Sequence, residues 1–142
     1  MSGAALDVVR DDARGDAAFL AALEDGSLPG EAFDHRAHLR LCWLLVRRHG
    51  PEAGAERVAA LLRTFSAAKG AAHKFHVTLT RAWTGCVAAA LAASPDADFE
   101  RFLLLHPELL DRALLQRHYL PQTLAAPEAR ERWVAPDVAP LP

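Results

Sequence analysis

The sequence has few cysteines, only Cys42 and Cys86 among its 142 residues. Neither belongs to a C-x-x-C pair, and each lies within an apolar run that has helical spacing. A free cysteine in such a run usually packs as a small hydrophobic residue. We therefore expect both thiols to be buried, and we do not expect a structural disulfide.

An excess of charge of either sign is also lacking. The chain carries 16 Lys and Arg residues against 18 Asp and Glu residues, which gives a formal net charge of −2. Its basic residues are scattered, and the short clusters 47–48 and 130–132 are too small to form a basic patch. Such a pattern argues against a nucleic-acid or membrane-surface partner. A small-molecule substrate or ligand is the partner that we expect.

Long apolar runs and a secretory leader are missing as well. The longest uncharged stretch, residues 82–95, contains Trp, Thr, Gly and Ser and falls short of a membrane-spanning helix. The first seven residues lack the basic and apolar regions of a signal peptide. We therefore expect a cytoplasmic protein.

Helical periodicity, by contrast, runs along most of the chain, and no strand-like alternation interrupts it. Asp34 is a good N-cap, Gly50 and Pro51 close one helix and open the next, and Gly70 and Pro95 supply further breaks. The predicted helices span residues 16–24, 35–49, 51–68, 73–93, from a cap at Asp96 or Asp98 to Leu105, and 108–118. The sequence thus predicts an all-α fold, a helical bundle of about four main helices plus short C-terminal helices.

The length fits a single helical domain spanning residues 1–142. Residues 1–13 are predicted to form a loose leader. Residues 121–142, which contain several prolines, are predicted to be a tail packed on the bundle. The helices at residues 34–49 and 73–93 are the most apolar, so we expect them to be central neighbours.

Two H-x-x-H pairs, His35 with His38 and His73 with His76, stand at the starts of these two helices. Residues i and i+3 share a helical face, so each pair can direct two imidazoles the same way. The helix dipole disfavours a protonated imidazole near a helix N-terminus, and the neutral ring is the form that binds metal ions. The two starts can meet only if the helices run parallel or cross steeply.

These features predict a metal site formed by His35, His38 and His76, with His73 as a weaker fourth ligand. One divalent transition-metal ion (copper, zinc, iron or nickel) suits such an all-nitrogen site. Three imidazoles and an open position are typical of catalytic centres. The predicted wall of the pocket consists of Cys42, Trp43, Phe75, Thr80 and Trp83.

The leading functional hypothesis is a small metal-dependent enzyme that acts on a small molecule through this three-histidine centre. Two alternatives remain open. The first alternative is a non-catalytic protein that binds a metal or a small ligand. The second is an interaction domain without a metal site, whose histidines only bond backbone groups at the helix starts. The sequence contains no G-x-S-x-G motif and no phosphate-binding loop.

The segments Phe33-x-His35-x-x-His38-Leu39 and Lys74-Phe75-His76-x-Thr78-Leu79-Thr80 resemble the motifs of an uncharacterised bacterial family of small helical proteins. The resemblance covers nearly the whole chain, including the Pro140-Leu141-Pro142 ending, and it implies a bacterial source but no activity. The second motif of that family reads Lys-Tyr-His-Glu-Thr. This chain has Phe75 in place of the tyrosine and Val77 in place of the glutamate, so any chemistry that depends on that glutamate is absent here.

Overall fold

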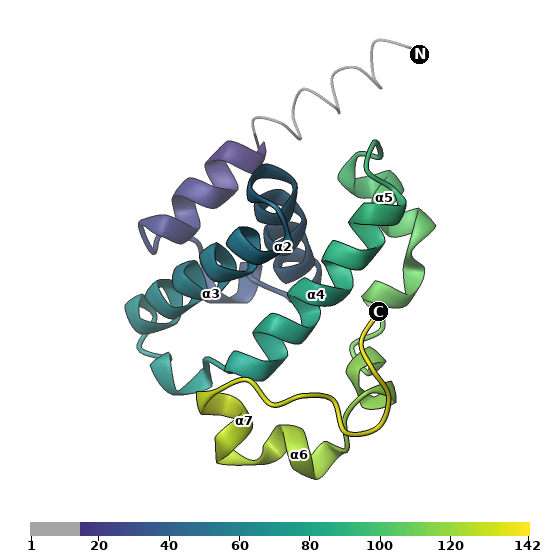
Figure 1. The fold of residues 1–142 in the computed structure, drawn as a ribbon. Coiled ribbons are helices and arrows are strands. Elements are labelled where there is room, and N and C mark those ends of the chain that lie inside the picture. Colours follow the sequence, from purple (N-terminus) through teal and green to yellow (C-terminus); the bar gives the residue numbers. More distant parts are fainter. Residues whose placement is uncertain (1–14) are drawn as a thin grey trace.

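The computed structural model describes residues 15–142, and within this range the only regular secondary structure is helical (Figure 1). This confirms the predicted all-α class. A helix covers residues 15–24, and the later elements are η1 (Gly30–Ala32), α2 (His35–His49), α3 (Pro51–Ala68), η2 (Ala72–Lys74), α4 (Val77–Ala93), α5 (Phe99–Leu105), η3 (Pro107–Leu110), η4 (Leu114–Arg117), α6 (Pro121–Ala125) and α7 (Pro127–Glu131). The leader predicted for residues 1–13 lies outside the described residues.

The boundaries of α2 follow directly from the local sequence. The carboxylate of Asp34 accepts a hydrogen bond from the backbone N–H of Ala37 at 2.9 Å, which satisfies one of the free donors at the helix start. Gly50 ends the helix with a φ of +89°, a conformation that side chains with a Cβ rarely adopt. Pro51 then opens α3 at the position where its missing N–H costs nothing.

Helix α2 lies in the middle of the bundle and packs against both α3 and α4. Its residues 41–46 are all buried, so no face of this stretch reaches solvent. Gly54 of α3 permits a very close approach, because a Cβ added there would lie 2.7 Å from the Cα of Val46. The short connection at Gly50 and this contact hold α2 and α3 together as a tight pair.

Helices α2 and α4 cross instead of running side by side. The ring of His35 packs edge-on against Trp83, with centroids 4.6 Å apart, and Cys42 Sγ lies 3.4 Å from Thr84 Oγ1. His35 and Cys42 are roughly 10 Å apart along α2, yet they contact adjacent residues of α4. Crossing is one of the two arrangements that would let the helix starts meet.

Two predicted helices differ from the structure. The helix expected from residue 73 begins only at Val77, because residues 72–74 form the 3₁₀ turn η2 and His76 has an extended backbone. The helix expected over residues 108–118 is divided into η3 and η4. Between them the backbone of Asp111 is extended, and its carboxylate accepts from the N–H of Ala113, a local bond that competes with helix formation.

The C-terminal segment packs on α4 through a buried threonine (Figure 1, yellow). Thr78 Oγ1 donates to the carbonyl of Arg132 and accepts from the N–H of Val134. The hydroxyl of the buried Tyr119 donates to the carbonyl of Val134 at 2.7 Å. These bonds satisfy polar groups of an otherwise irregular segment and fix its path across the bundle.

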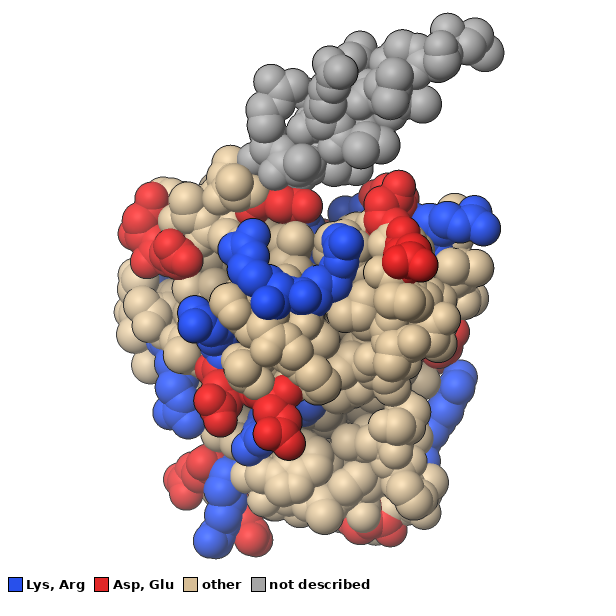
Figure 2. All heavy atoms as spheres, turned by 45° about the horizontal axis from the view of Figure 1, so that its top comes forward, with Lys and Arg blue, Asp and Glu red and all other residues tan. Residues whose placement is uncertain are grey.

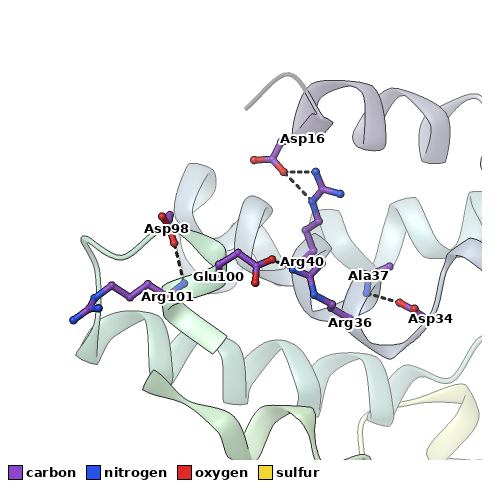
Figure 3. Close-up of polar contacts among 8 residues, drawn as sticks. All are labelled: Asp16, Asp34, Arg36, Ala37, Arg40, Asp98, Glu100 and Arg101. Carbon is purple, nitrogen blue, oxygen red and sulfur yellow. Dashed lines mark hydrogen bonds and ion pairs between the residues drawn. The ribbon is translucent and has the colours of Figure 1, made fainter. Parts of the chain in front are cut away.

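Charged residues of both signs are interspersed on the face shown in Figure 2, and ion pairs tie flanking helices to α2 (Figure 3). The guanidinium of Arg40 donates twice to Asp16 Oδ1, at 2.8 and 2.6 Å, and Arg36 pairs with Glu100 of α5. Of the two caps that the sequence offered, Asp96 and Asp98, Asp98 caps the start of α5. No helix among residues 15–142 is both long enough and apolar enough to cross a membrane.

Candidate functional site: a histidine-lined cavity

A cavity of about 280 Å³ lies where the starts of α2 and α4 meet the C-terminal half of α3. We call it the histidine cavity. It is lined by Phe33, Asp34, His35, His38, Leu62, Ser66, Lys74, Phe75, His76, Leu79, Thr80 and Arg112. The histidines 35, 38 and 76 thus border the same space although the last is far from the others in sequence. His73 is exposed and does not line the cavity, and its backbone carbonyl accepts a bond from Arg130.

His35 is anchored to the segment that follows α5. Its Nε2 lies 2.8 Å from the carbonyl oxygen of Leu109. A carbonyl can only accept, so Nε2 carries the proton and the Nδ1 of a neutral ring keeps a free lone pair. The edge-on packing on Trp83 fixes the plane of this imidazole. Together these contacts orient His35 before any ligand binds.

His38 lies one helical turn further along α2. The residue is partly exposed, but its Nε2 atom is buried and has no hydrogen-bond partner among residues 15–142. Burial, and secondarily the nearby His35, lower the pKa of His38 to about 4. His38 is therefore neutral at pH 7, and a buried polar atom without a partner is rare enough in folded proteins to need an explanation, of which a bound ligand is one.

His76 is the N-cap residue of α4. Its Nδ1 accepts from the N–H of Leu79 at 3.0 Å, and its Nε2 donates to the carbonyl of Leu124 at 2.8 Å. Both ring nitrogens are therefore engaged with the backbone. This imidazole joins the start of α4 to α6, a structural role that the H-x-x-H spacing did not indicate.

In the structure as it stands, the histidine cavity does not offer three free imidazole nitrogens placed to bind one metal ion. Among the described residues, no group of three or more His, Cys, Asp or Glu side chains is arranged to hold a metal ion. The engaged nitrogens of His76 and the exposed position of His73 account for this. Nδ1 of His35 and both ring nitrogens of His38 make no hydrogen bond among these residues, and of the three only Nε2 of His38 is a buried atom without a partner.

The predicted wall residues divide into two groups. Phe75 and Thr80 line the histidine cavity, and Trp83 supports it through the ring of His35. Cys42 and Trp43 do not line it. Cys42 is buried against Thr84, and burial raises the pKa of its thiol to about 12. Trp43 lies about 140° around α2 from His38, so its ring faces the aromatic side chains of α5 instead.

Sequence reasoning missed two cations at this site. Lys74 and Arg112 both line the histidine cavity, and neither forms an ion pair with any residue in the described range. The one acidic residue of the lining, Asp34, uses its carboxylate to cap α2. The proximity of Lys74 to His76 in sequence was a weak signal, whereas Arg112 reaches the cavity only through the turn between η3 and η4.

Val77 lines a neighbouring groove of about 330 Å³ between α3 and α4. Val77 is the first residue of α4 after its N-cap His76, but it does not border the histidine cavity. No protein-family model, curated protein or solved structure matches this chain.

Proposed function

We propose that the protein binds a small anionic molecule, a carboxylate or a phosphate ester, in the histidine cavity. The observation that carries this proposal is the combination of Lys74 and Arg112 with a buried imidazole nitrogen of His38 that lacks a partner. Arginine and lysine bind carboxylate and phosphate oxygens through charge-assisted hydrogen bonds. The cavity also opens at the starts of α2 and α4, where helix dipoles favour negative charge.

The apolar part of the lining suits a ligand that also has a hydrocarbon or aromatic portion. Phe33, Leu62, Phe75 and Leu79 border the same space as the two cations. Small-molecule sites commonly combine apolar wall residues with placed polar groups, and in this cavity the polar residues are the more numerous. His38, which is neutral at pH 7, can hydrogen-bond such a ligand through its buried Nε2.

Metal binding is the second candidate, and one observation favours it. Histidines that bind metals usually donate their other ring N–H to a backbone carbonyl or carboxylate, as His35 does to Leu109. His35 Nδ1 and His38 Nε2 would supply two ligands, and His76 would join them only by giving up its cap or its bond to Leu124. Elemental analysis of untagged protein after purification without chelators tests this candidate directly.

Anion binding is tested by titrating the protein with inorganic phosphate, phenyl phosphate and benzoate in a calorimeter at constant ionic strength. We expect Arg112→Gln and Lys74→Gln to weaken binding of the preferred anion by about tenfold or more each, the cost of one lost charge-assisted hydrogen bond. Arg117→Gln is the matched control, because Arg117 lies outside the cavity and faces Asp111.

The resonances of His38 provide a second readout in the same titration. A bound anion next to this imidazole favours its protonated form, so the pKa of His38 rises on binding. Binding that leaves His38 unperturbed, or that is equally strong in the Arg112→Gln and Arg117→Gln variants, would rule out this cavity as the anion site.

A further inference from the structure

A second arrangement of reactive side chains lies beyond the C-terminal end of α4. The hydroxyl oxygen of Ser94, the residue that follows this helix, is 2.8 Å from Nε2 of His106. The other ring nitrogen of His106, Nδ1, is 3.6 Å from a carboxylate oxygen of Glu108. A serine, an imidazole and a carboxylate therefore stand in line, with one ring nitrogen facing each neighbour.

This order is the one that nucleophilic catalysis requires. The hydroxyl of serine is a weak nucleophile until a neighbouring base accepts its proton, and a carboxylate on the far side of the base stabilises the imidazolium that forms. The distance from Ser94 to His106 is within hydrogen-bond reach for this transfer. Glu108 is about half-exposed, and its carboxylate lies 3.6 Å from Nδ1 of His106. At this distance the attraction between the two side chains is strongest once the imidazole is charged.

A cavity of about 270 Å³ lies beside His106 and Glu108, and we call it the His106 cavity. Both His106 and Glu108 line it, as do apolar residues of α4 and the η3–η4 segment: Ala89, Ala90, Ala93, Leu109 and Leu114. It shares no lining residue with the histidine cavity. The walls suit a short acyl chain, and Ser94 meets this cavity through its bond to His106 without being a lining residue itself.

The cysteine at this cavity is a poor alternative nucleophile. Cys86 also lines the wall, but burial raises the pKa of its thiol to about 11. A protonated thiol is unreactive, because the thiolate is the nucleophile. The thiol of Cys86 makes no side-chain hydrogen bond in the described part of the chain, whereas the hydroxyl of Ser94 bonds to His106.

We propose that Ser94, His106 and Glu108 form a nucleophile, general base and orienting carboxylate that hydrolyse small esters with a short acyl group. The Oγ of Ser94 bonds to the carbonyl carbon of the ester while His106 Nε2 takes the hydroxyl proton. The bond from that carbon to the alcohol oxygen then breaks, and the alcohol leaves with the proton from His106. A water molecule next attacks the acyl-serine, gives its proton to His106, and releases the carboxylic acid as Ser94 regains the proton.

The test is covalent labelling with an alkyl fluorophosphonate, followed by mass spectrometry, together with hydrolysis of p-nitrophenyl acetate. We expect one label per chain on Ser94 and turnover that Ser94→Ala abolishes. His106→Gln keeps a hydrogen-bonding side chain but removes the base, so we expect labelling and hydrolysis to slow by about a hundredfold or more. Glu108→Gln should slow hydrolysis by about fivefold, the factor corresponding to an exposed ion pair.

Ser27→Ala is the matched serine control, because Ser27 is exposed and its hydrogen-bond neighbour is the carboxylate of Asp25 and not an imidazole. It should label and turn over at the wild-type rate, and thermal unfolding should show that all variants remain folded. If the Ser94–His106 bond serves only to anchor the end of α4, His106→Gln will react as fast as wild type. That result, absence of label on Ser94, or labelling of another residue would overturn the proposal.

Discussion

The imidazole of His35 donates a hydrogen bond to the carbonyl oxygen of Leu109, 74 positions later in the chain, at a distance of 2.8 Å. This bond joins the start of α2 to η3 and leaves Nδ1 of His35 as the ring nitrogen without a bond to the backbone. The H-x-x-H spacing assigned His35 to a metal-binding pair. In the structure His35 also anchors the start of α2 to a segment far along the chain. The consequences of this double role can be measured.

Replacing His35 with Phe should separate anchoring from packing. Phe preserves a ring that can pack on Trp83 but cannot donate to Leu109. A partly buried carbonyl then loses its partner, so we expect the free energy of unfolding to fall by about 1–3 kcal/mol in urea titrations. His73→Phe, at an exposed position, should change it by less than about 0.5 kcal/mol. Equal effects of the two substitutions would contradict the anchoring role.

Replacing His76 with Ala should destabilise the protein even without any ligand. The substitution removes the N-cap of α4 and the bond to the Leu124 carbonyl, each contributing about 1 kcal/mol, so we expect a loss of about 2 kcal/mol. His76→Asn restores a capping oxygen and should recover about half of this loss. Chemical denaturation of the three proteins measures the effect. A His76→Ala variant as stable as wild type would contradict the capping geometry.

The buried imidazole of His38 should make stability depend on pH. Its pKa is about 4 in the folded protein against an ordinary value of 6.5. Between these pH values the unfolded chain binds a proton that the folded protein excludes, so stability falls as the pH drops from about 6.5 to about 4. The loss is at most about 3 kcal/mol.

Urea titrations at pH 7.0 and 4.5 test this pH dependence. His38→Gln should show a smaller loss between the two values than wild type, because glutamine does not titrate. His73→Gln, which removes an exposed histidine, should retain the wild-type difference. Identical losses in wild type and His38→Gln would show that other groups cause the pH dependence.

Two glycines within helices should respond to alanine in opposite directions. A Cβ at Gly54 would lie 2.7 Å from the Cα of Val46, so Gly54→Ala must push α3 away from α2 and should cost about 1–3 kcal/mol. A Cβ at Gly85, within α4, meets no heavy atom within 4 Å. Gly85→Ala should therefore stabilise the protein by about 0.5–1 kcal/mol, as expected from helix propensity. Thermal and urea unfolding of both variants provide the comparison.

The sequence alone determined the helical class and several helix ends. Asp34 and Asp98 cap their helices through hydrogen bonds to the residue three positions later. Gly50 and Pro51 end one helix and start the next because of their own backbone preferences. These features depend on interactions between near neighbours, so local patterns are sufficient to predict them. The predictions for two helices, residues 73–93 and 108–118, were wrong for a local reason too. The turns at residues 72–74 and 111–113 compete with helix formation.

Only the tertiary structure decided what each histidine does. The H-x-x-H spacing placed His35, His38 and His76 correctly at two helix starts, but it carried no information on the carbonyls of Leu109 and Leu124. Those acceptors come from segments 74 and 48 residues away. The Leu124 carbonyl engages the second ring nitrogen of His76, whereas the Leu109 carbonyl leaves Nδ1 of His35 free. Likewise, Arg112 reaches the histidine cavity, and His106 reaches Ser94, because the chain turns back after α4. Contacts of this range arise from packing, which no local sequence pattern encodes.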